Sequence, residues 1–364
     1  MKYQNEYRGK EEVRKILDEL QRIVTREHSI MEICGGQTHT LVGYGLLDML
    51  PKKITMIHGP GCPVCVTPIS ILDNAVELAL EHDVTLFSFG DMLRIPGTSK
   101  SLLEARAEGG KVKAVYSPLE AVTYAEKNPN EEVVFLSIGF ETTMPANAYA
   151  VDLAKKRGLE NFSILVSHVL VPPAVEAVMS DPLTKVDALL AAGHVCTITG
   201  LSEYGPLVEK VKIPIVVTGF EPLDLLQGIL MAVKQLEAGE IKLENQYGRV
   251  VKAEGNPAAM EVTRRVFEIT DMEWRGLGVI PRSGLQLRPE YADFDASLRF
   301  SLDTCKIESE SECIAADILK GIKKPPECPA FGTRCVPENP LGAPMVSNEG
   351  ACSAYYQHAQ MTSI

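Results

Sequence analysis

The sequence predicts an α/β protein with two Rossmann-like units built on parallel sheets and a smaller, irregular third domain. Three observations lead to this prediction. Short apolar runs alternate with helical patterns through the middle of the chain, which is typical of parallel sheets covered on both faces. The chain has 364 residues, so two or three domains are expected. After about residue 245, glycine and proline become frequent, and five cysteines lie between residues 305 and 352.

The secondary-structure elements follow from the spacing of apolar residues. Residues 10–28 repeat apolar positions at helical intervals and predict an amphipathic helix. Short, mostly apolar runs then predict seven strands, at residues 54–57, 84–89, 112–116, 133–138, 162–167, 188–192 and 213–218. Helical patterns lie between them, at residues 70–82, 101–108 and 148–156. Such alternation favours parallel strands joined by crossover helices.

A polar stretch, EKNPNEE at residues 126–132, indicates a domain boundary. The expected units are an α/β domain with a thiol site (residues 30–128), a second α/β domain (residues 129–245) and a third domain organised by a metal cluster (residues 1–29 and 246–364). A short internal echo supports two α/β units, because Gly-Phe-Glu occurs at both 139–141 and 219–221.

Composition and charge exclude several classes of protein. The net charge of −12 argues against a nucleic-acid binder, because neutralising phosphates requires a basic face. The first residues lack the apolar core of a signal peptide, and no run approaches the ~18 apolar residues of a membrane helix. A cytoplasmic, reducing location is therefore expected. The nine cysteines are then better explained as ligands or redox groups than as structural disulfides.

Four cysteines near the end of the chain follow the spacing C-x14-C-x6-C-x16-C: Cys313, Cys328, Cys335 and Cys352. Four thiolates satisfy a [4Fe–4S] cluster, one for each iron. The wide spacing differs from zinc ribbons, which favour paired C-x2–4-C arms, and from the compact ferredoxin run. A zinc site and unrelated buried thiols remain as alternatives. Cys305 is a spare thiol in this reading.

A second candidate site contains Cys34, which follows a short apolar run and precedes two glycines. The missing side chains would let another molecule approach the backbone and the thiol. His39, five residues later, could act as a base or as a hydrogen-bond donor to a bound group. The alternative is a buried cysteine beside a glycine turn.

A C-x2-C motif, Cys62 and Cys65, lies between the strand at 54–57 and the helix that begins near residue 69. The positive end of a helix dipole lowers the pKa of a thiol there, and two such thiols can close a disulfide and exchange electrons. Half of a zinc site and a structural role are the alternatives, although no second nearby pair completes a zinc site.

Polar residues also follow several expected strands, where α/β sheets place their ligand sites. Glu141 and Asp91 could line a cleft, but a helix N-cap or an acidic first turn explains them equally well. His168 and His194 could form polar walls, although such histidines are more often structural. Cys196 lies in an apolar stretch and is expected in the core. The chain has no P-loop, no early G-x-G-x-x-G and no C-x3-C-x2-C motif.

Taken together, the motifs resemble those of the HypD family, maturation factors of [NiFe]-hydrogenases. The matches are Cys34-Gly-Gly-Gln-Thr-His39, Gly59-Pro-Gly-Cys-Pro-Val-Cys65, Gly139-Phe-Glu-Thr-Thr143 and the four C-terminal cysteines. They occur in order across essentially the whole chain. Each motif alone is weak, whereas the combination is highly specific.

The resemblance implies a function that composition does not reveal. HypD proteins form a complex with the small chaperone HypC, and on this scaffold an iron ion receives two cyanides and one carbonyl. HypE supplies the cyanide, and the finished Fe(CN)2CO unit passes through the chaperone to the hydrogenase large subunit. The family fold consists of two α/β domains around a cleft and a cluster-bearing third domain. The expected protein is a cytoplasmic maturation factor with redox activity rather than a metabolic enzyme, without nucleic-acid or membrane partners.

By the same resemblance, Cys34 is a ligand of the iron being assembled, with His39 and Glu141 supporting the site. Cys62 and Cys65 are a redox-active pair. The four C-terminal cysteines hold the [4Fe–4S] cluster, and we expect the cluster to reduce a Cys62–Cys65 disulfide. Position 37 is Gln, where some members of the family have His, so an imidazole is not required there. Cys196 and Cys305 lie outside the family pattern.

Two other functions compete with the scaffold. A free-standing disulfide reductase, similar to ferredoxin:thioredoxin reductase, would also pair a cluster with a dithiol. A structural zinc protein with a binding role is the third possibility. Cys34 and its two glycines favour the scaffold over the reductase, because a reductase needs no third thiol with an open approach.

Overall fold

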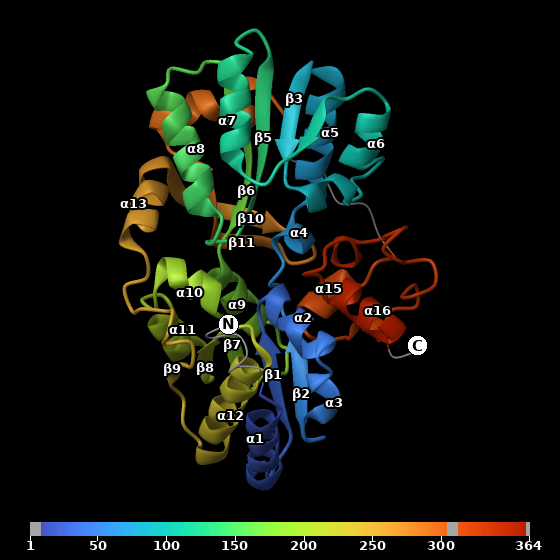
Figure 1. Ribbon diagram of the computed structural model, residues 1–364, viewed down its shortest axis with the longest axis vertical. Helices are drawn as coiled ribbons and strands as arrows, with labels where there is room; N and C mark the ends of the chain where they lie inside the picture. Colours follow the sequence, from blue (N-terminus) through green and yellow to red (C-terminus); the bar gives the residue numbers. More distant parts are fainter. Residues whose placement is uncertain (1–8, 304–311, 362–364) are drawn as a thin grey trace.

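The computed structural model describes residues 9–303 and 312–361, so Cys305 lies outside the described residues. Two β-sheets, each covered by helices, lie one above the other (Figure 1). The C-terminal segment, with α15 and α16, lies beside their junction (Figure 1). Ala343 and Val346 of this segment pack into the core of the upper sheet, while α16 contacts α2 of the lower one.

The lower sheet is parallel throughout, with the strand order β2-β1-β7-β8-β9. Its strands are β1 (His28–Glu32), β2 (Ile54–His58), β7 (Ala188–Ala192), β8 (Ile215–Thr218) and β9 (Leu243–Asn245). Because the strands are parallel, the carboxyl ends of β1, β7 and β8 meet at one edge of this sheet.

The upper sheet is mixed, with the order β10-β11-β6-β5-β3-β4. Its parallel strands are β3 (Val84–Ser88), β4 (Val112–Ala114), β5 (Glu132–Gly139) and β6 (Phe162–Val169). An antiparallel hairpin, β10 (Phe267–Trp274) and β11 (Gly278–Leu287), extends the sheet beyond β6.

The helices of the lower part are α1 (Lys10–Ile23), α2 (Gly35–Gly43), α3 (Leu46–Met49), α9 (Val171–Met179), α10 (Gly193–Thr199), α11 (Tyr204–Val211) and α12 (Pro222–Ala238). Those of the upper part and its connections are α4 (Pro63–Val66), α5 (Ile69–Glu81), α6 (Leu102–Ala107), α7 (Pro118–Lys127), α8 (Met144–Lys156), α13 (Pro257–Val266) and α14 (Ala296–Arg299). The C-terminal segment adds α15 (Ala315–Leu319) and α16 (Ala351–Met361), and short 3-10 turns lie at Gly90–Arg94, Pro289–Phe294, Pro325–Glu327 and Ala343–Met345.

Several helices begin where the sequence offers a cap. Ser101 and Ser117 form capping boxes with Glu104 and Glu120, so backbone N–H groups at the starts of α6 and α7 find side-chain acceptors. Pro118 follows Ser117 at the first helical position, where its missing N–H group costs nothing.

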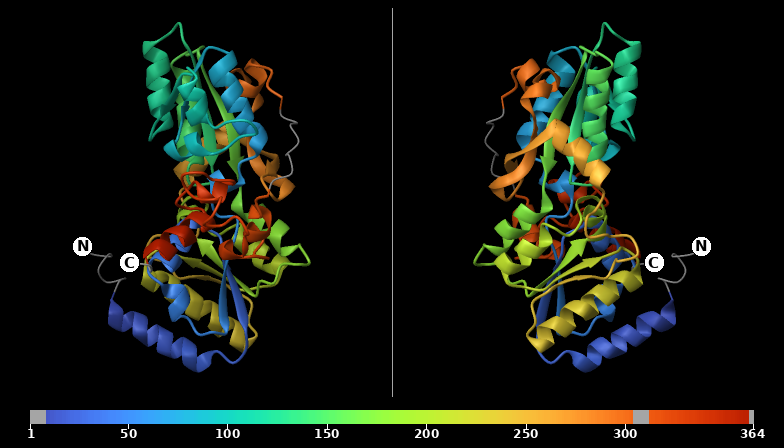
Figure 2. Two further views of the ribbon diagram at one scale, coloured as in Figure 1. Left: turned by 90° about the vertical axis from the view of Figure 1, so that its right-hand side faces the viewer. Right: turned by 90° about the vertical axis from the view of Figure 1, so that its left-hand side faces the viewer.

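The N-terminal helix α1 packs on α12 at the outer end of the lower sheet (Figure 2). Leu20 is fully buried there with Ile229 and Val233. The expected helix over residues 10–28 ends at Ile23, because Val24 turns to an extended conformation and the chain then enters β1.

The α/β prediction is confirmed, and all seven expected strands are present within two residues at their ends. Four strands were not expected. β1 is not among the predicted strands, and only its first residue, His28, falls within the helix expected at residues 10–28. β9 is only three residues long, and β10 and β11 lie after residue 245, where the sequence predicts irregular structure because glycine and proline become frequent and the periodicity weakens.

The two sheets divide the chain differently from the expected ranges. The boundary expected at residues 128–129 falls between β4 and β5, which belong to one sheet, while β1 and β2 share a sheet with β7 to β9. The chain thus passes from one sheet to the other after β2, after β6 and after β9. The third expected domain is also split, since α1 packs on the lower sheet and β10 and β11 extend the upper one.

Among the helices of the described residues, none combines the length and the apolar character that crossing a bilayer requires.

Candidate functional site

The carboxyl edge of the lower sheet brings three side chains together. Cys34 follows β1, His194 follows β7 and Phe220 follows β8, and these three strands are neighbours. The sulfur of Cys34 lies 3.8 Å from both ring nitrogens of His194, so it is not aligned with one nitrogen. The His194 ring stacks on Phe220 with 4.9 Å between the centroids.

Cys34, His194 and Phe220 together form what we call the thiol corner. The glycines after Cys34 allow other parts of the chain to pack closely around it. A Cβ atom on Gly36 would lie 3.2 Å from the Phe220 ring and 3.7 Å from the Cys34 sulfur. A Cβ atom on Gly35 would lie 2.2 Å from the backbone oxygen of Glu349, which belongs to the C-terminal segment. The Cys-Gly-Gly motif therefore serves close packing around the thiol, and the thiol itself is only 3% exposed.

The surroundings of Cys34 disfavour a free thiolate. Burial raises the pKa of Cys34 well above its usual range, and the carboxylates of Glu32 and Glu349 raise it further. The backbone N–H groups of Gly36 and Gln37, at the start of α2, act in the opposite direction. Burial also lowers the pKa of His194 to about 4, so this imidazole is neutral at neutral pH.

Glu32 is the hydrogen-bonding centre of the Cys34 loop. One of its oxygens accepts the backbone N–H of Cys34 at 2.8 Å. The other accepts the hydroxyl of Thr38 and lies 2.6 Å from Nδ1 of His58. A carboxylate with three donors around it is fully satisfied although only 1% exposed.

His39 and Gln37 point to different sides of α2. His39 lies on the exposed side of α2, and in the described part of the chain no hydrogen bond or ion pair joins it to Cys34. Gln37 is fully buried, and its amide nitrogen donates to the Thr218 hydroxyl at 2.6 Å and to the Ala191 carbonyl at 3.3 Å. The side chain of position 37 thus ties α2 to β7 and β8.

Cys62 and Cys65 form a disulfide. They lie on their own short helix, α4, rather than at the start of α5 as expected, because Pro68 separates the two helices. Cys62 caps α4, with its sulfur accepting the N–H of Cys65 at 3.2 Å. Both are buried.

The disulfide motif and the Cys34 loop touch through Gly61. A Cβ atom on Gly61 would lie 2.2 Å from the carbonyl carbon of Ile33 and 2.3 Å from the nitrogen of Cys34. The carbonyl of Gly61 also accepts the N–H of Gly35 at 3.2 Å. The backbone of the disulfide motif is therefore in direct contact with the backbone of the Cys34 loop.

Over the part of the chain that the structure describes, no hydrogen bond or ion pair joins Glu141 to Cys34, His194 or Phe220. Its carboxyl group is 2% exposed and accepts the N–H of Val171 at 2.9 Å. Burial raises the pKa of Glu141 to about 8. Its neighbours are Cys196 and Tyr204, whose pKa values are raised by burial first and by Glu141 in part. Cys196 is fully buried, as predicted.

His168 is a satisfied core histidine. Nδ1 lies 3.2 Å from the carbonyl of Gly139, and Nε2 lies within 3.0 Å of Ser137 Oγ and Asn147 Nδ2. Burial lowers its pKa to about 4. Asp91, in contrast, is exposed and accepts the hydroxyl of Ser347 at 3.2 Å.

The four C-terminal cysteines gather at one place. Cys335 and Cys352 are buried in a small apolar cluster to which Cys328 belongs in part. Burial raises the pKa of Cys313 and of Cys352, and in both cases the other thiols of the group raise it further. The four sulfurs are therefore close enough to interact.

Backbone groups also approach these sulfurs. The N–H of Leu341 donates to the Cys335 sulfur at 3.4 Å, and the N–H of Ala315 favours the thiolate of Cys313. A Cβ atom on Gly342 would lie 2.3 Å from the Cys313 sulfur. Such N–H groups at the sulfurs suit an iron–sulfur cluster. Within the described residues, no group of three or more histidine, cysteine, aspartate or glutamate side chains is arranged to hold a metal ion.

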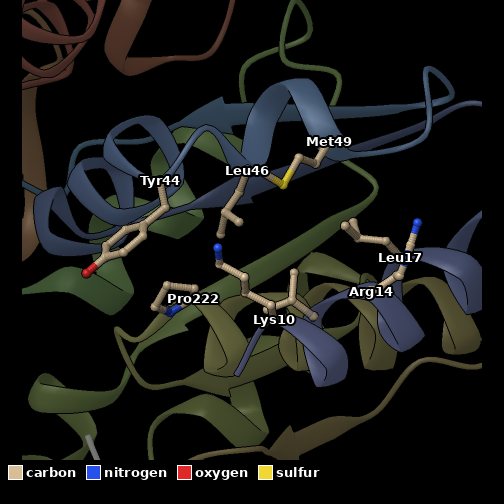
Figure 3. A pocket seen from close by; sticks show the side chains of 8 residues that line it. Lys10, Arg14, Leu17, Tyr44, Leu46, Met49 and Pro222 are labelled. Carbon is tan, nitrogen blue, oxygen red and sulfur yellow. The ribbon is translucent and has the colours of Figure 1, made fainter. Parts of the chain in front are cut away.

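An apolar groove of about 550 Å³ lies outside these sites, between α1 and the segment around α3. Figure 3 shows Lys10, Arg14 and Leu17 of α1 on one side and Leu46 and Met49 on the other. The groove opens near the C-terminal end of α2, whereas Cys34 lies at its N-terminal end. It shares no residue with the thiol corner.

Sequence reasoning undervalued three residues of this site. His194 was recognised at a strand end but was ranked as structural, because the strand order that places β7 beside β1 cannot be read from the sequence. Glu32 and His58 lie just before the matched motifs, two residues before Cys34 and immediately before Gly59. A charged residue within an apolar run was the available signal.

Comparison with known proteins gives a consistent result. A family model described as "HypD: Hydrogenase formation hypA family" matches residues 11–359. The chain is 45% identical over 369 residues to the hydrogenase expression/formation protein HupD of Azotobacter chroococcum, covering 99% of this chain and 97% of that protein. It is 44% identical to hydrogenase maturation factor HypD of Azotobacter vinelandii, with the same coverage, and 42% identical to that of Escherichia coli K12 over the whole of both chains.

Proposed function

The chain belongs to the HypD family, and from this premise we propose that it is the assembly scaffold for the Fe(CN)2CO unit of a [NiFe]-hydrogenase. In this role it holds one iron ion as cargo while cyanide and carbonyl ligands are attached. A HypC-type chaperone shares the iron, a HypE-type protein donates the cyanide, and the hydrogenase large subunit receives the product through the chaperone. The names of the relatives support the process of hydrogenase maturation.

The environment of Cys34 is the observation that carries this proposal. A buried thiol beside two carboxylates is a poor free nucleophile, because its proton is held tightly. A divalent iron ion reverses that balance: it replaces the proton, and Glu32 and Glu349 then favour the bound cation. The neutral imidazole of His194, 3.8 Å away, adds no competing positive charge.

The C-terminal cysteines fit a resident [4Fe–4S] cluster. Cys313, Cys328, Cys335 and Cys352 would hold it, with backbone N–H groups at two of the sulfurs. Such a cluster supplies single electrons at a potential set by those hydrogen bonds and by burial. The Cys62–Cys65 disulfide takes up two electrons and two protons on reduction and yields two thiols. Gly61, one residue before Cys62, contacts the backbone of the Cys34 loop, and this contact supports a redox pair beside the proposed iron site.

An infrared spectrum tests the proposal. The protein would be purified without oxygen after co-expression with its small chaperone and cyanide-delivery partners. We expect cyanide and carbonyl stretches in the wild type and in a Cys196→Ala control, and none in Cys34→Ala. The control removes another buried thiol that lies outside the corner.

The competing function is a free-standing disulfide reductase. Absence of the cyanide and carbonyl stretches from a wild-type sample that is brown and fully loaded with iron and sulfide would overturn the scaffold and favour the reductase. Retention of the stretches in Cys34→Ala would instead move the iron to another ligand.

A further inference from the structure

A chain of hydrogen bonds, buried at Glu32 and His58 and partly buried at Tyr355, connects the thiol corner with the C-terminal helix α16. Oε1 of Glu32 lies 2.6 Å from Nδ1 of His58, and Nε2 of His58 lies 2.9 Å from the hydroxyl of Tyr355. Glu32 and His58 come from the neighbouring strands β1 and β2, and Tyr355 is 297 residues away from His58. Each of the three stands close in sequence to one of three cysteines: Cys34, Cys62 and Cys352.

The direction of these hydrogen bonds follows from their partners. The carboxylate of Glu32 offers only acceptor oxygens to Nδ1 of His58, so Nε2 is the acceptor of this imidazole and the Tyr355 hydroxyl donates to it. Nδ1 of His58 then carries its proton and donates to Glu32. The second oxygen of Glu32 accepts the backbone N–H of Cys34 at 2.8 Å. The chain that begins at Tyr355 therefore ends on the backbone of Cys34.

A second contact joins the same two parts of the molecule. The backbone of Glu349, six residues before Tyr355, lies so close to Gly35 that a Cβ atom there would stand 2.2 Å from its oxygen. Helices α2 and α16 pack side by side (Figure 1). The C-terminal segment thus forms one wall of the thiol corner, although it carries a different cysteine site.

We propose that Tyr355 is a positioning residue for Cys34. Through His58 it fixes the carboxylate that holds the Cys34 backbone, so the helix that carries Cys352 sets the geometry of the thiol corner. The effect on iron assembly rests on the proposed function, whereas the positioning of the thiol does not. Loss of the Tyr355 hydroxyl leaves the side chains of Glu32 and His58 present but removes one hydrogen bond that restrains them.

Packing alone is the competing explanation. The Tyr355 ring also meets the His58 ring edge to face, with 5.3 Å between the centroids. Tyr355→Phe keeps that ring contact and removes only the hydroxyl, so it separates the hydrogen bond from the packing. Tyr356→Phe is the matched control, because Tyr356 lies on the same helix and its ring contacts Phe331 instead.

The test is the rate of alkylation of Cys34 by iodoacetamide in the isolated, cluster-loaded protein without oxygen. Tryptic peptides 27–52 and 186–210 each contain one cysteine, Cys34 or Cys196, so mass spectrometry follows both rates in one sample. A buried thiol reacts through local opening. Loss of one hydrogen bond should increase the Cys34 rate about fivefold, which corresponds to about 1 kcal/mol, and leave the Cys196 rate unchanged.

Two outcomes would overturn the positioning role. One is an unchanged Cys34 rate in Tyr355→Phe. The other is general loosening of the protein. It would appear as an equal rise in the alkylation rates of Cys34 and Cys196, or as a similar rise in the Cys34 rate of Tyr356→Phe. In a His58→Asn background, Tyr355→Phe should add little, because the connection is already broken; if that background does not fold, the single variant still decides.

The same variants separate this inference from the proposed function. If the wild type shows cyanide and carbonyl stretches, Tyr355→Phe should reduce their intensity several-fold at unchanged iron and sulfide content. If the wild type shows none, the scaffold function fails, while the alkylation rates still support or overturn the role of Tyr355.

Discussion

The sulfur of Cys34 lies 3.8 Å from both ring nitrogens of His194, although 160 residues separate them in the chain. The contact exists because β1 and β7 are parallel neighbours, so the loops that follow them meet. His39, the histidine nearest to Cys34 in the sequence, lies exposed on α2. The imidazole of the thiol corner is therefore supplied by a distant strand.

Substitution of these two histidines should have very different effects. His194→Gln removes a neutral imidazole from beside the proposed iron ligand, and we expect about tenfold weaker cyanide and carbonyl stretches. His39→Gln changes an exposed side chain and should leave the stretches near the wild-type intensity. The infrared intensity per cluster-loaded chain is the measurement. A stronger loss in His39→Gln would show that the wrong histidine has been assigned to the site.

Glu141 should make stability depend on pH. Burial raises its pKa to about 8, whereas in the unfolded chain it titrates near 4.5. Between these values the folded protein binds more protons than the unfolded one, so the free energy of unfolding falls as pH rises from about 4.5 to about 8. The slope has a ceiling of about 1.4 kcal/mol per pH unit.

Glu141→Gln tests this dependence, because glutamine has no proton to lose. Urea unfolding at pH 5, 6, 7 and 8 should show the variant gaining stability relative to the wild type as pH rises. Asp91→Asn, at an exposed carboxylate, is the control and should show no such trend. A constant difference between Glu141→Gln and the wild type at all four pH values would contradict the assignment.

The sequence predicted the local elements well and their arrangement poorly, for a physical reason. Strand and helix follow from nearby apolar spacing, and the run at residues 188–192 is correctly a buried strand. Which sheet a strand joins depends on crossover connections between distant segments. The sequence therefore does not reveal that the chain returns to the lower sheet after β6 and places β7 beside β1. For the same reason, the proximity of His194, Glu349 and Tyr355 to Cys34 or its loop could not be predicted, because it arises only through tertiary packing.

Other parts of the site could be predicted because their cause is local. The pairing of Cys62 with Cys65 depends on three residues of separation at a helix start. The expectation that the glycines after Cys34 leave an open approach for another molecule is wrong for this structure, because the chain's own residues Glu349 and Phe220 occupy that space and the thiol is buried.

Gly61 should tolerate no side chain. Its Cβ position lies 2.2 Å from Ile33 and 2.3 Å from Cys34, and both contacts are to backbone atoms that cannot rotate away. Gly61→Ala should cost about 1–3 kcal/mol of unfolding free energy. Gly43→Ala is the control, because no atom lies within 4 Å of its Cβ position and it ends α2. Equal stability of both variants in urea would refute the close contact.

Gly342 should matter for the C-terminal cysteines in particular. A Cβ atom there would stand 2.3 Å from the Cys313 sulfur, so Gly342→Ala must displace that thiol or the loop. We expect at least half of the iron and acid-labile sulfide to be lost, with little change in the alkylation of Cys196. Gly205→Ala, where nothing lies within 4 Å, should keep full iron. Full loading of Gly342→Ala would contradict the prediction that close packing of Gly342 against Cys313 is needed for cluster binding.

The redox role of the Cys62–Cys65 disulfide can be tested separately from the binding of the cluster. It lies in a short helix with its own backbone bonds and involves none of the four C-terminal thiols. Replacement of both cysteines by serine should therefore abolish hydrogenase maturation while leaving iron and sulfide content unchanged. Hydrogenase activity in cells carrying the variant, together with iron analysis of the purified chain, measures both effects.

In the wild type, two further thiols per chain should become reactive after reduction of the Cys62–Cys65 disulfide. Normal maturation with the double variant would exclude a redox role for this pair and leave Cys34 as the functional thiol of the site.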